Sequence, residues 1–215
     1  MKNLIKLIFI LPFLILLFYY HTSYGAINSL EELRKTITEK RRNLTDFSCD
    51  FIQTKKLKMF ARPITVKGKL FIRATKGMRL EIFEPMPATL ILTKDKMIRC
   101  DESGNKAVIS FSNSKIAKQI AQDVSSWMTL DLDALDKRYK VRYLNPGSAS
   151  PLLEILPKVK NTKRLIKKMD IRLNGSTLLP ESIEIKHTDG DLTEFLFSGC
   201  TAQEERFSTD FTLCR

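Results

Sequence analysis

Apolar and polar residues alternate through residues 66–83, in two segments that flank Lys76-Gly77. In the second segment Met78, Leu80 and Ile82 alternate with charged residues, and the first segment follows the same rule with lysines between its apolar positions. A period of two is typical of strands with one buried face and one solvated face. The pattern predicts a hairpin whose apolar face covers either a packed core or a bound ligand.

Similar runs recur to the C-terminus and predict roughly ten or eleven antiparallel strands, the last at about Phe207–Leu213. Asn174-Gly175 and Asp189-Gly190 are pairs that tight hairpin turns prefer, because both central residues of such turns need a positive φ. No repeat or interior domain boundary interrupts the pattern. The strands therefore predict a single antiparallel sheet.

Helices are predicted at the start of the chain and in its middle. Ser29 and Glu32 have the spacing of a capping box, and apolar residues recur at helical spacing from Leu30 to about Leu44. A second helix begins after Asn113 or Ser114, and a short helical turn follows at Asp131–Asp136. The fold class predicted is α+β: a strongly curved antiparallel sheet, or unclosed β-barrel, capped by an N-terminal helix and one or two inserted helices.

The N-terminus has the three parts of a secretory signal peptide. Lys2 and Lys6 precede an apolar run from Leu7 to Tyr20, and Ser23 and Gly25 are small residues before the expected cleavage site. A run of this length is short for a membrane span, although an uncleaved anchor is the alternative. We therefore expect a signal peptide at 1–25 and one exported domain at 26–215.

The formal net charge of +12 admits nucleic acid, an anionic membrane surface or an acidic partner. Export argues against nucleic acid, and no nucleic-acid module is recognisable. Because the positive charges are spread along the chain, a solvated outer face is the favoured explanation of them. Transient contact with a membrane stays open.

Four cysteines remain after cleavage, an even number that permits two disulfides in an exported protein. Among the three possible pairings, Cys200–Cys214 with Cys49–Cys100 is favoured, since Cys200 and Cys214 flank an expected turn and final strand. Free buried thiols are the alternative. The spacing contains no paired CxxC motif, so no metal site is expected.

The chain offers little for catalysis. His187 is the only histidine after residue 25, and it shares a strand face with Ile183 and Ile185. No nucleophile elbow and no glycine-rich phosphate loop is present, although a hydrolase would need a base and a nucleophile. We expect neither an enzyme nor a cofactor.

Several short motifs occur in a fixed order along the chain. They are Phe51-Ile52-Gln53, Gly68–Ile72, Met78–Ile82 before Pro85, Leu90-Ile91-Leu92 before Lys94-Asp95-Lys96, and Asp189-Gly190 before Leu192–Phe197. In this order and spacing, from Phe51 onward, the chain resembles the LolA-like outer-membrane lipoprotein carrier family, as a divergent member.

The resemblance implies a curved sheet capped by helices, with an apolar cavity for acyl chains between the two layers. It also implies a monomer in the periplasm of a diderm bacterium. This monomer would carry lipoproteins, or another acylated lipid, from an inner-membrane ABC transporter to an outer-membrane acceptor. Related half-barrels serve as sensors or envelope assembly factors that bind lipoprotein or protein partners without transport, which is the alternative. Without the resemblance, a core sealed by its own side chains would be the simpler interpretation.

Twelve apolar residues are the expected cavity lining. They are Leu70, Ile72, Ala74, Met78, Leu80, Ile82, Leu90 and Leu92 from the strands, and Ile116, Ile120, Val124 and Trp127 from the second helix. Carriers of the family often have Arg-Pro after the second strand, where the arginine helps to close the helical lid. Here Ala74-Thr75 stands at those positions, and Leu80 replaces an aromatic residue.

Overall fold

The computed structural model describes residues 27–42, 46–73, 75–202, 211–212 and 214. Within these ranges eleven strands form one antiparallel sheet. They are β1 (Asp46–Lys56), β2 (Ile64–Arg73), β3 (Gly77–Glu84), β4 (Ala88–Leu92), β5 (Lys96–Cys100), β6 (Lys106–Ser110), β7 (Tyr139–Tyr143), β8 (Leu152–Pro157), β9 (Ile166–Leu173), β10 (Pro180–His187) and β11 (Leu192–Ala202). The expected signal peptide at 1–25 and Ala74 lie outside the described residues.

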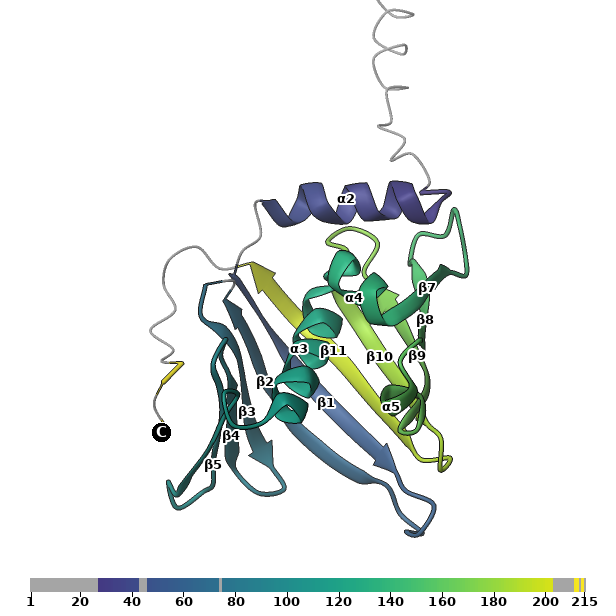
Figure 1. The fold of residues 1–215 in the computed structure, drawn as a ribbon. Helices are drawn as coiled ribbons and strands as arrows, with labels where there is room; N and C mark the ends of the chain where they lie inside the picture. The colour runs from purple at the N-terminus through teal and green to yellow at the C-terminus, as the bar shows by residue number, and fades with distance from the viewer. Residues whose placement is uncertain (1–26, 43–45, 74, 203–210, 213, 215) are drawn as a thin grey trace, which may run out of the picture.

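The strand order is β6-β5-β4-β3-β2-β1-β11-β10-β9-β8-β7, so β6 and β7 are free edges and the sheet does not close. The sheet curves around the helices, as Figure 1 shows. The order follows the chain except at the centre, where β1 pairs with β11 and places Phe51 opposite Phe197. The predicted unclosed, curved antiparallel sheet is confirmed.

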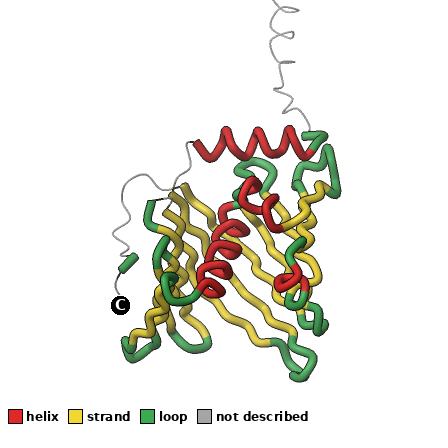
Figure 2. The backbone as a smooth tube through the Cα atoms, in the orientation of Figure 1, coloured by secondary structure: helices red, strands yellow, loops and turns green. Residues whose placement is uncertain are grey.

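The helices lie on the concave side of the sheet and across one end of it (Figure 2). They are α2 (Leu30–Arg42), α3 (Lys115–Thr129), α4 (Leu132–Arg138) and the single turn α5 (Lys160–Lys163). The hydroxyl of Ser29 accepts the backbone N–H of Glu32 at 3.1 Å, as predicted. The Glu32 carboxylate accepts the backbone N–H of Asn28 at 2.9 Å, which completes the cap of α2. No helix in the described part of the chain is both long and apolar enough to span a bilayer.

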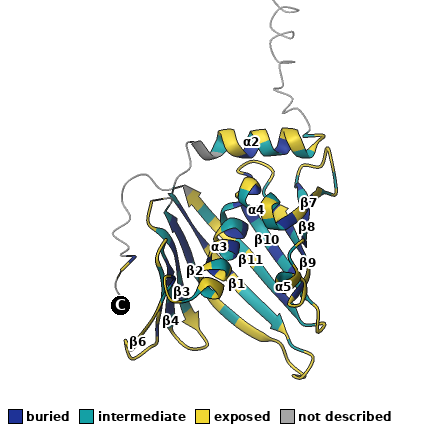
Figure 3. Ribbon diagram, in the orientation of Figure 1, coloured by how far each residue is buried: buried dark blue, intermediate teal, exposed yellow. Residues whose placement is uncertain are grey.

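The two faces of the sheet bury different clusters, because successive side chains point to opposite faces. The inner face carries the main core, which includes Leu70, Ile72 and Met78 together with buried residues of the helices. The outer face carries a smaller cluster of Phe71, Ile91, Ile98 and Cys100, covered by Phe211. Figure 3 shows the buried residues concentrated along the strands and on the sheet-facing sides of the helices.

Gly68 in β2 lies where two neighbouring strands leave no room for a side chain. A Cβ at this position would sit 2.1 Å from the backbone oxygen of Glu81 and 2.8 Å from the ring of Phe51. We expect Gly68→Ala to lower the free energy of unfolding by about 1–3 kcal/mol, the usual cost of overpacking. Urea denaturation measures this, with the exposed Thr65→Ala in the same strand as the control. Equal stability of the two variants would contradict the geometry.

Two predicted turns need correction, and a predicted strand lies mostly outside the described residues. Asn174-Gly175 does not form a two-residue hairpin: the connection spans residues 174–179, and the Asn174 side chain accepts the N–H groups of Ser176 and Thr177. The connection at Asp189-Gly190 is likewise wider, from 188 to 191, with a positive φ only at Gly190. Of the predicted last strand, the described residues 211 and 212 form a bend, and the rest lies outside the described residues.

The predicted disulfide pairing is wrong. Cys49 is joined to Cys200 and Cys100 to Cys214, so neither Cys200–Cys214 nor Cys49–Cys100 forms. The reason is the strand order: β1 and β11 are neighbours, which brings Cys49 beside Cys200 on the inner face. Cys100 points to the outer face, where it meets Cys214. Two disulfides fit an exported protein in an oxidising compartment.

Candidate functional site

The expected lining residues divide between the core and an incompletely covered region. Five of them are buried in the main core, and whether they contact a ligand stays a prediction. These five are Leu70, Ile72, Met78, Leu92 and Trp127. Leu80, Ile82 and Val124 are partly buried and pack against that core. Leu90 is also only partly buried.

Helix α3 packs on the core with large side chains at its C-terminal end and with small ones, Ala117 and Ala121, nearer its N-terminal end. At its C-terminal end Trp127 and Met128 are buried, and the Trp127 ring meets the Tyr139 ring edge-on at 6.2 Å. At its N-terminal end Ile116 and Ile120 are 76% and 55% exposed. Since positions 116, 120 and 127 share one helical face, the apolar face of α3 continues from the core into solvent. Figure 1 shows α3 lying in front of the concave side of the sheet.

The space between α3 and the sheet is nearly closed where α3 is docked. A crevice with about 160 Å³ of empty space lies there, and it is too narrow for a water molecule. It is lined by Phe47, Cys49, Leu70, Met128, Pro180 and Phe197. Ligand pockets usually measure roughly 300–1,000 Å³. This crevice is therefore too small to hold an acyl chain.

Aromatic residues of β1 and β11 also face this region, and the sequence reasoning missed them. Phe195 and Phe197 are stacked with ring centroids 6.1 Å apart, and Phe195 lies 6.4 Å from the ring of Phe51. The alternation of residues 192–197 was a sufficient signal, because it places Phe195 and Phe197 on one face. What it did not reveal is that β11 pairs with β1 and so brings that face to the centre of the sheet.

A second, polar pocket of about 690 Å³ lies between α3, α4 and the turns after β2 and β4. Its floor includes Met78, Leu92 and Phe111 from the core, whereas much of its wall is polar or charged. The charged lining residues are Lys76, Lys94, Asp123, Asp131, Lys137 and Arg138. This pocket does not coincide with the expected apolar lining, although it shares the same floor.

Asp123 connects α3 to α4 at the wall of this pocket. Its carboxylate accepts the Nε–H of Arg138 at 3.0 Å and the side-chain N–H of Gln119 at 3.2 Å. Burial, together with the nearby Asp123 carboxylate, raises the pKa of Tyr139 above its usual range. The Asp123–Arg138 pair ties the C-terminal half of α3 to α4.

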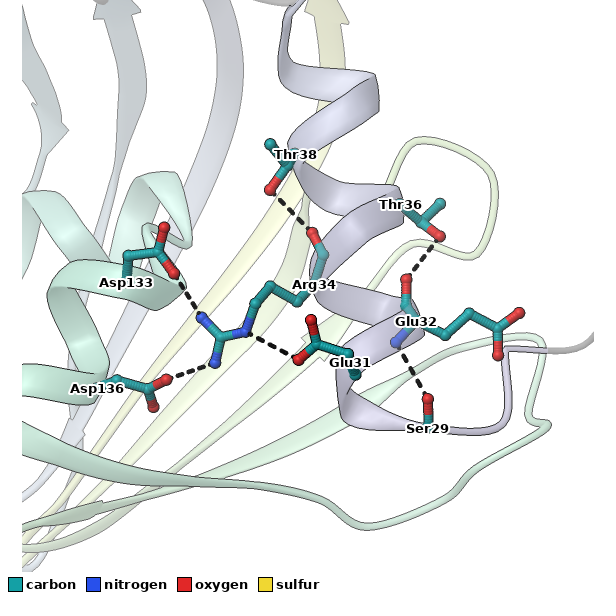
Figure 4. A network of polar contacts seen from close by, with 8 residues as sticks. All are labelled: Ser29, Glu31, Glu32, Arg34, Thr36, Thr38, Asp133 and Asp136. Atoms are coloured by element: carbon teal, nitrogen blue, oxygen red, sulfur yellow. Dashed lines mark hydrogen bonds and ion pairs between the residues drawn. The ribbon is translucent and has the colours of Figure 1, made fainter.

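Arg34 joins α2 to α4, as Figure 4 shows. Its guanidinium donates to Asp133 Oδ1 at 2.8 Å and to Asp136 Oδ2 at 2.5 Å, and Glu31 of the same helix lies 4.0 Å away. An arginine that bridges two carboxylates makes charge-assisted bonds in a fixed geometry. The family's Arg-Pro is replaced here by Ala74-Thr75. The Arg34 bridge is a different contact, between two helices, and the sequence did not predict it.

We expect Arg34→Ala to lower the free energy of unfolding by about 1–2 kcal/mol at low salt, since it leaves two carboxylates unpaired. High salt should shrink the difference, because exposed ion pairs are screened. Lys35→Ala is the matched control: it removes the same charge from the next, exposed position of α2. Chemical denaturation of both variants at low and high salt measures the effect. If Lys35→Ala costs as much, the bridge does not stabilise the helices.

Among the residues described, no group of three or more histidine, cysteine or carboxylate side chains is placed to hold a metal ion. His187 contacts Thr193 through its Nε2 at 3.1 Å. The prominent features of the inner side are therefore an apolar wall, a helix whose apolar side is partly exposed, and a polar pocket beside them.

Comparison with known proteins identifies the family. The sequence profile of the family described as "Outer membrane lipoprotein carrier protein LolA" matches residues 42–214. The sequence matches none of the curated proteins with which it was compared.

Several solved structures are similar in fold at low identity. One is a domain provisionally assigned as an outer membrane lipoprotein-sorting protein from Vibrio parahaemolyticus (15% identity, TM-score 0.47, 84% of this chain and 95% of that one). Another is an uncharacterised conserved protein from Thermus thermophilus (8% identity, TM-score 0.49, 80% and 88%). A third is a LolA superfamily protein from Nitrosomonas europaea (12% identity, TM-score 0.38, 79% and 93%).

The family profile covers most of the sequence, and the open, helix-capped antiparallel sheet agrees with it. This chain belongs to the LolA family of outer-membrane lipoprotein carriers.

Proposed function

We propose that this protein is a periplasmic carrier that binds acyl chains of lipoproteins, or of a related lipid, between the inner face of the sheet and helix α3. The observation that carries the proposal is the apolar face of α3, which leaves the core and ends in the exposed Ile116 and Ile120. Partly covered apolar residues, such as Leu80 and Ile82, remain on the sheet. Family membership supports the same function.

The energy of transfer explains why a carrier is needed. Each CH₂ group exposed to water costs about 0.8 kcal/mol, so a C16 chain costs on the order of 12 kcal/mol. Spontaneous passage of such a chain through the periplasm would be very slow. An apolar wall and a mobile apolar helix replace the membrane interior for the time of transit.

Loading requires α3 to open, and the structure suggests which end moves. The C-terminal half is held by the buried Trp127 and by the Asp123–Arg138 pair. The N-terminal half exposes its two isoleucines and packs on the core through small side chains, Ala117 and Ala121. In the proposed mechanism the N-terminal half swings outward, the acyl chain takes its place along the sheet, and Ile116 and Ile120 close over it.

The exchange partners follow from the family. We propose an inner-membrane ABC transporter as donor and an outer-membrane protein as acceptor, with this chain acting as a monomer between them. The polar pocket beside α3 is not needed for this function. Catalysis and cofactors have no part in the mechanism.

Native mass spectrometry of the protein purified from its own envelope tests the proposal. A carrier should retain acyl chains or a lipoprotein, seen as added mass that organic extraction removes. A protein free of added mass that instead binds a periplasmic protein tightly would contradict the carrier function. That result would favour the alternative, a half-barrel sensor or assembly factor.

A further inference from the structure

The end of the sheet opposite α2, where several strands turn, combines exposed apolar side chains with positive charge. We define this distal edge as the β1–β2 connection (57–63), the β3–β4 connection (85–87) and the β10–β11 connection (188–191). The strand pairing places all three at the same end of the sheet, since Lys67 of β2 pairs with Glu84 and Lys56 of β1 pairs with Leu192. Figure 1 shows α2 at the other end of the sheet.

Large apolar side chains at this edge lie in solvent. Met59 is 83% exposed and Phe60 is 53% exposed at the tip of the β1–β2 connection, and Met86 on the β3–β4 connection is 72% exposed. Burying such side chains is favourable, so their exposure at one end of the sheet indicates a binding surface.

Positive charge surrounds the same tip. Residues 51–63 contain Lys55, Lys56, Lys58 and Arg62 and no carboxylate. The carboxylates of the 188–191 connection are hydrogen-bonded to the backbone: Asp191 accepts the N–H of Lys58 at 2.9 Å, and Asp189 accepts the N–H of Asp191 at 3.0 Å. Glu84, which precedes the β3–β4 connection, pairs with Lys67 at 2.8 Å.

The tip is also held in place rather than free to fold back. Besides the Lys58–Asp191 bond, the backbone N–H of Phe60 donates to the oxygen of Leu57 at 3.0 Å, and the side chain of Lys58 lies against Gly190. Met59 and Phe60 are thus presented outward on a supported turn, with cations on both sides.

We propose that the distal edge docks onto an anionic membrane surface, with Met59 and Phe60 entering the headgroup region and the flanking cations contacting lipid phosphates. Exposed apolar residues next to lysine and arginine are the combination that binds an anionic bilayer interface. A protein partner would suit the apolar residues equally well, but the run of cations without carboxylates favours lipid phosphates. This inference goes beyond the carrier function and does not depend on it.

Docking in this orientation has a consequence for the inner face. Gln53 of β1 lies near the distal edge and pairs with Val66 of β2 and Phe195 of β11. Both partners are partly buried and pack against the core. The docked protein therefore turns a partly covered end of its apolar wall toward the bilayer. An acyl chain would pass from lipid to protein over a short distance.

Vesicle co-sedimentation tests the proposal with the processed protein purified from its own periplasm. The wild type should bind phosphatidylglycerol-containing vesicles at low salt and not pure phosphatidylcholine vesicles. Removing three cations (Lys56→Gln, Lys58→Gln and Arg62→Gln) should weaken binding on the order of 100-fold, at about 1 kcal/mol per cation. Met59→Ser with Phe60→Ser should weaken it roughly tenfold or more.

Matched controls come from elsewhere on the surface. Val108→Ser with Ile109→Ser removes two exposed apolar residues from the free-edge strand β6, and Lys35→Gln, Lys115→Gln and Lys118→Gln remove three exposed cations. All variants share one N-terminus, so differences in binding report the altered residues. Both controls should bind as the wild type does.

Absence of wild-type binding to any vesicle would overturn the proposal and assign the edge to a protein partner. Equal losses in the edge variants and the controls would overturn it too, as non-specific attraction. The carrier function is separable: edge variants should keep acyl cargo in native mass spectrometry, whereas Leu80→Glu should lose cargo and still bind vesicles.

Discussion

Replacing Leu80 with glutamate should reduce the acyl cargo that co-purifies with the protein by roughly tenfold or more, because a carboxylate would face the hydrocarbon chain. Leu80 lies on the inner face between Leu70 of β2 and Leu90 of β4, at a position that the core leaves partly uncovered. The measurement is lipid mass spectrometry of the purified variant, normalised to folded protein by circular dichroism.

The control for this variant is the same substitution on the other face. Ile52→Glu lies in β1, where Ile52 is solvent-exposed opposite Leu196. This variant should leave the amount of cargo unchanged, since the outer face does not contact the cargo. If folded Leu80→Glu retains as much cargo as Ile52→Glu, the inner face is not the binding wall.

Loss of the Cys49–Cys200 disulfide should be strongly destabilising. The bond closes a separation of 151 residues between β1 and β11. A cross-link over so long a loop removes much of the entropy of the unfolded chain, so Cys49→Ala with Cys200→Ala should lower the free energy of unfolding by about 2–5 kcal/mol. Chemical denaturation under non-reducing conditions measures it.

The second disulfide provides the comparison. Cys100–Cys214 spans 114 residues, so its removal should cost a similar amount by the same argument. It should also increase hydrogen exchange around Phe71 and Ile91, because Phe211 covers that cluster beside Cys214. Unchanged stability after removal of either bond would contradict the observed pairing.

The sequence was sufficient for features that depend on neighbours along the chain. The start of α2 follows from Ser29 and Glu32, which form their bonds within one helical turn. Strands β2 and β3 follow from alternation, since each side chain's face is set by its position in the strand. The family resemblance supplied the open, curved sheet, which periodicity alone does not distinguish from a closed one.

Features that depend on distant residues were missed or wrong. The disulfides follow from the pairing of β1 with β11, which no local pattern encodes. Helical spacing put Ile116 and Trp127 on one face, but it did not show that Trp127 is buried and Ile116 exposed. That difference depends on where the helix leaves the sheet. The Arg34 bridge to Asp133 and Asp136 likewise joins residues about a hundred positions apart.

The central claim is that cargo lies against the apolar face of α3, and a photocrosslink tests it most directly. A photoreactive amino acid at Ile120, in cells fed an alkynyl fatty acid, should yield a protein–acyl adduct. The same amino acid at Val108, which is exposed to a similar extent and lies opposite the outer-face Ile98, should yield none. Adducts of equal intensity at both positions, or none at Ile120 while cargo co-purifies, would contradict the account.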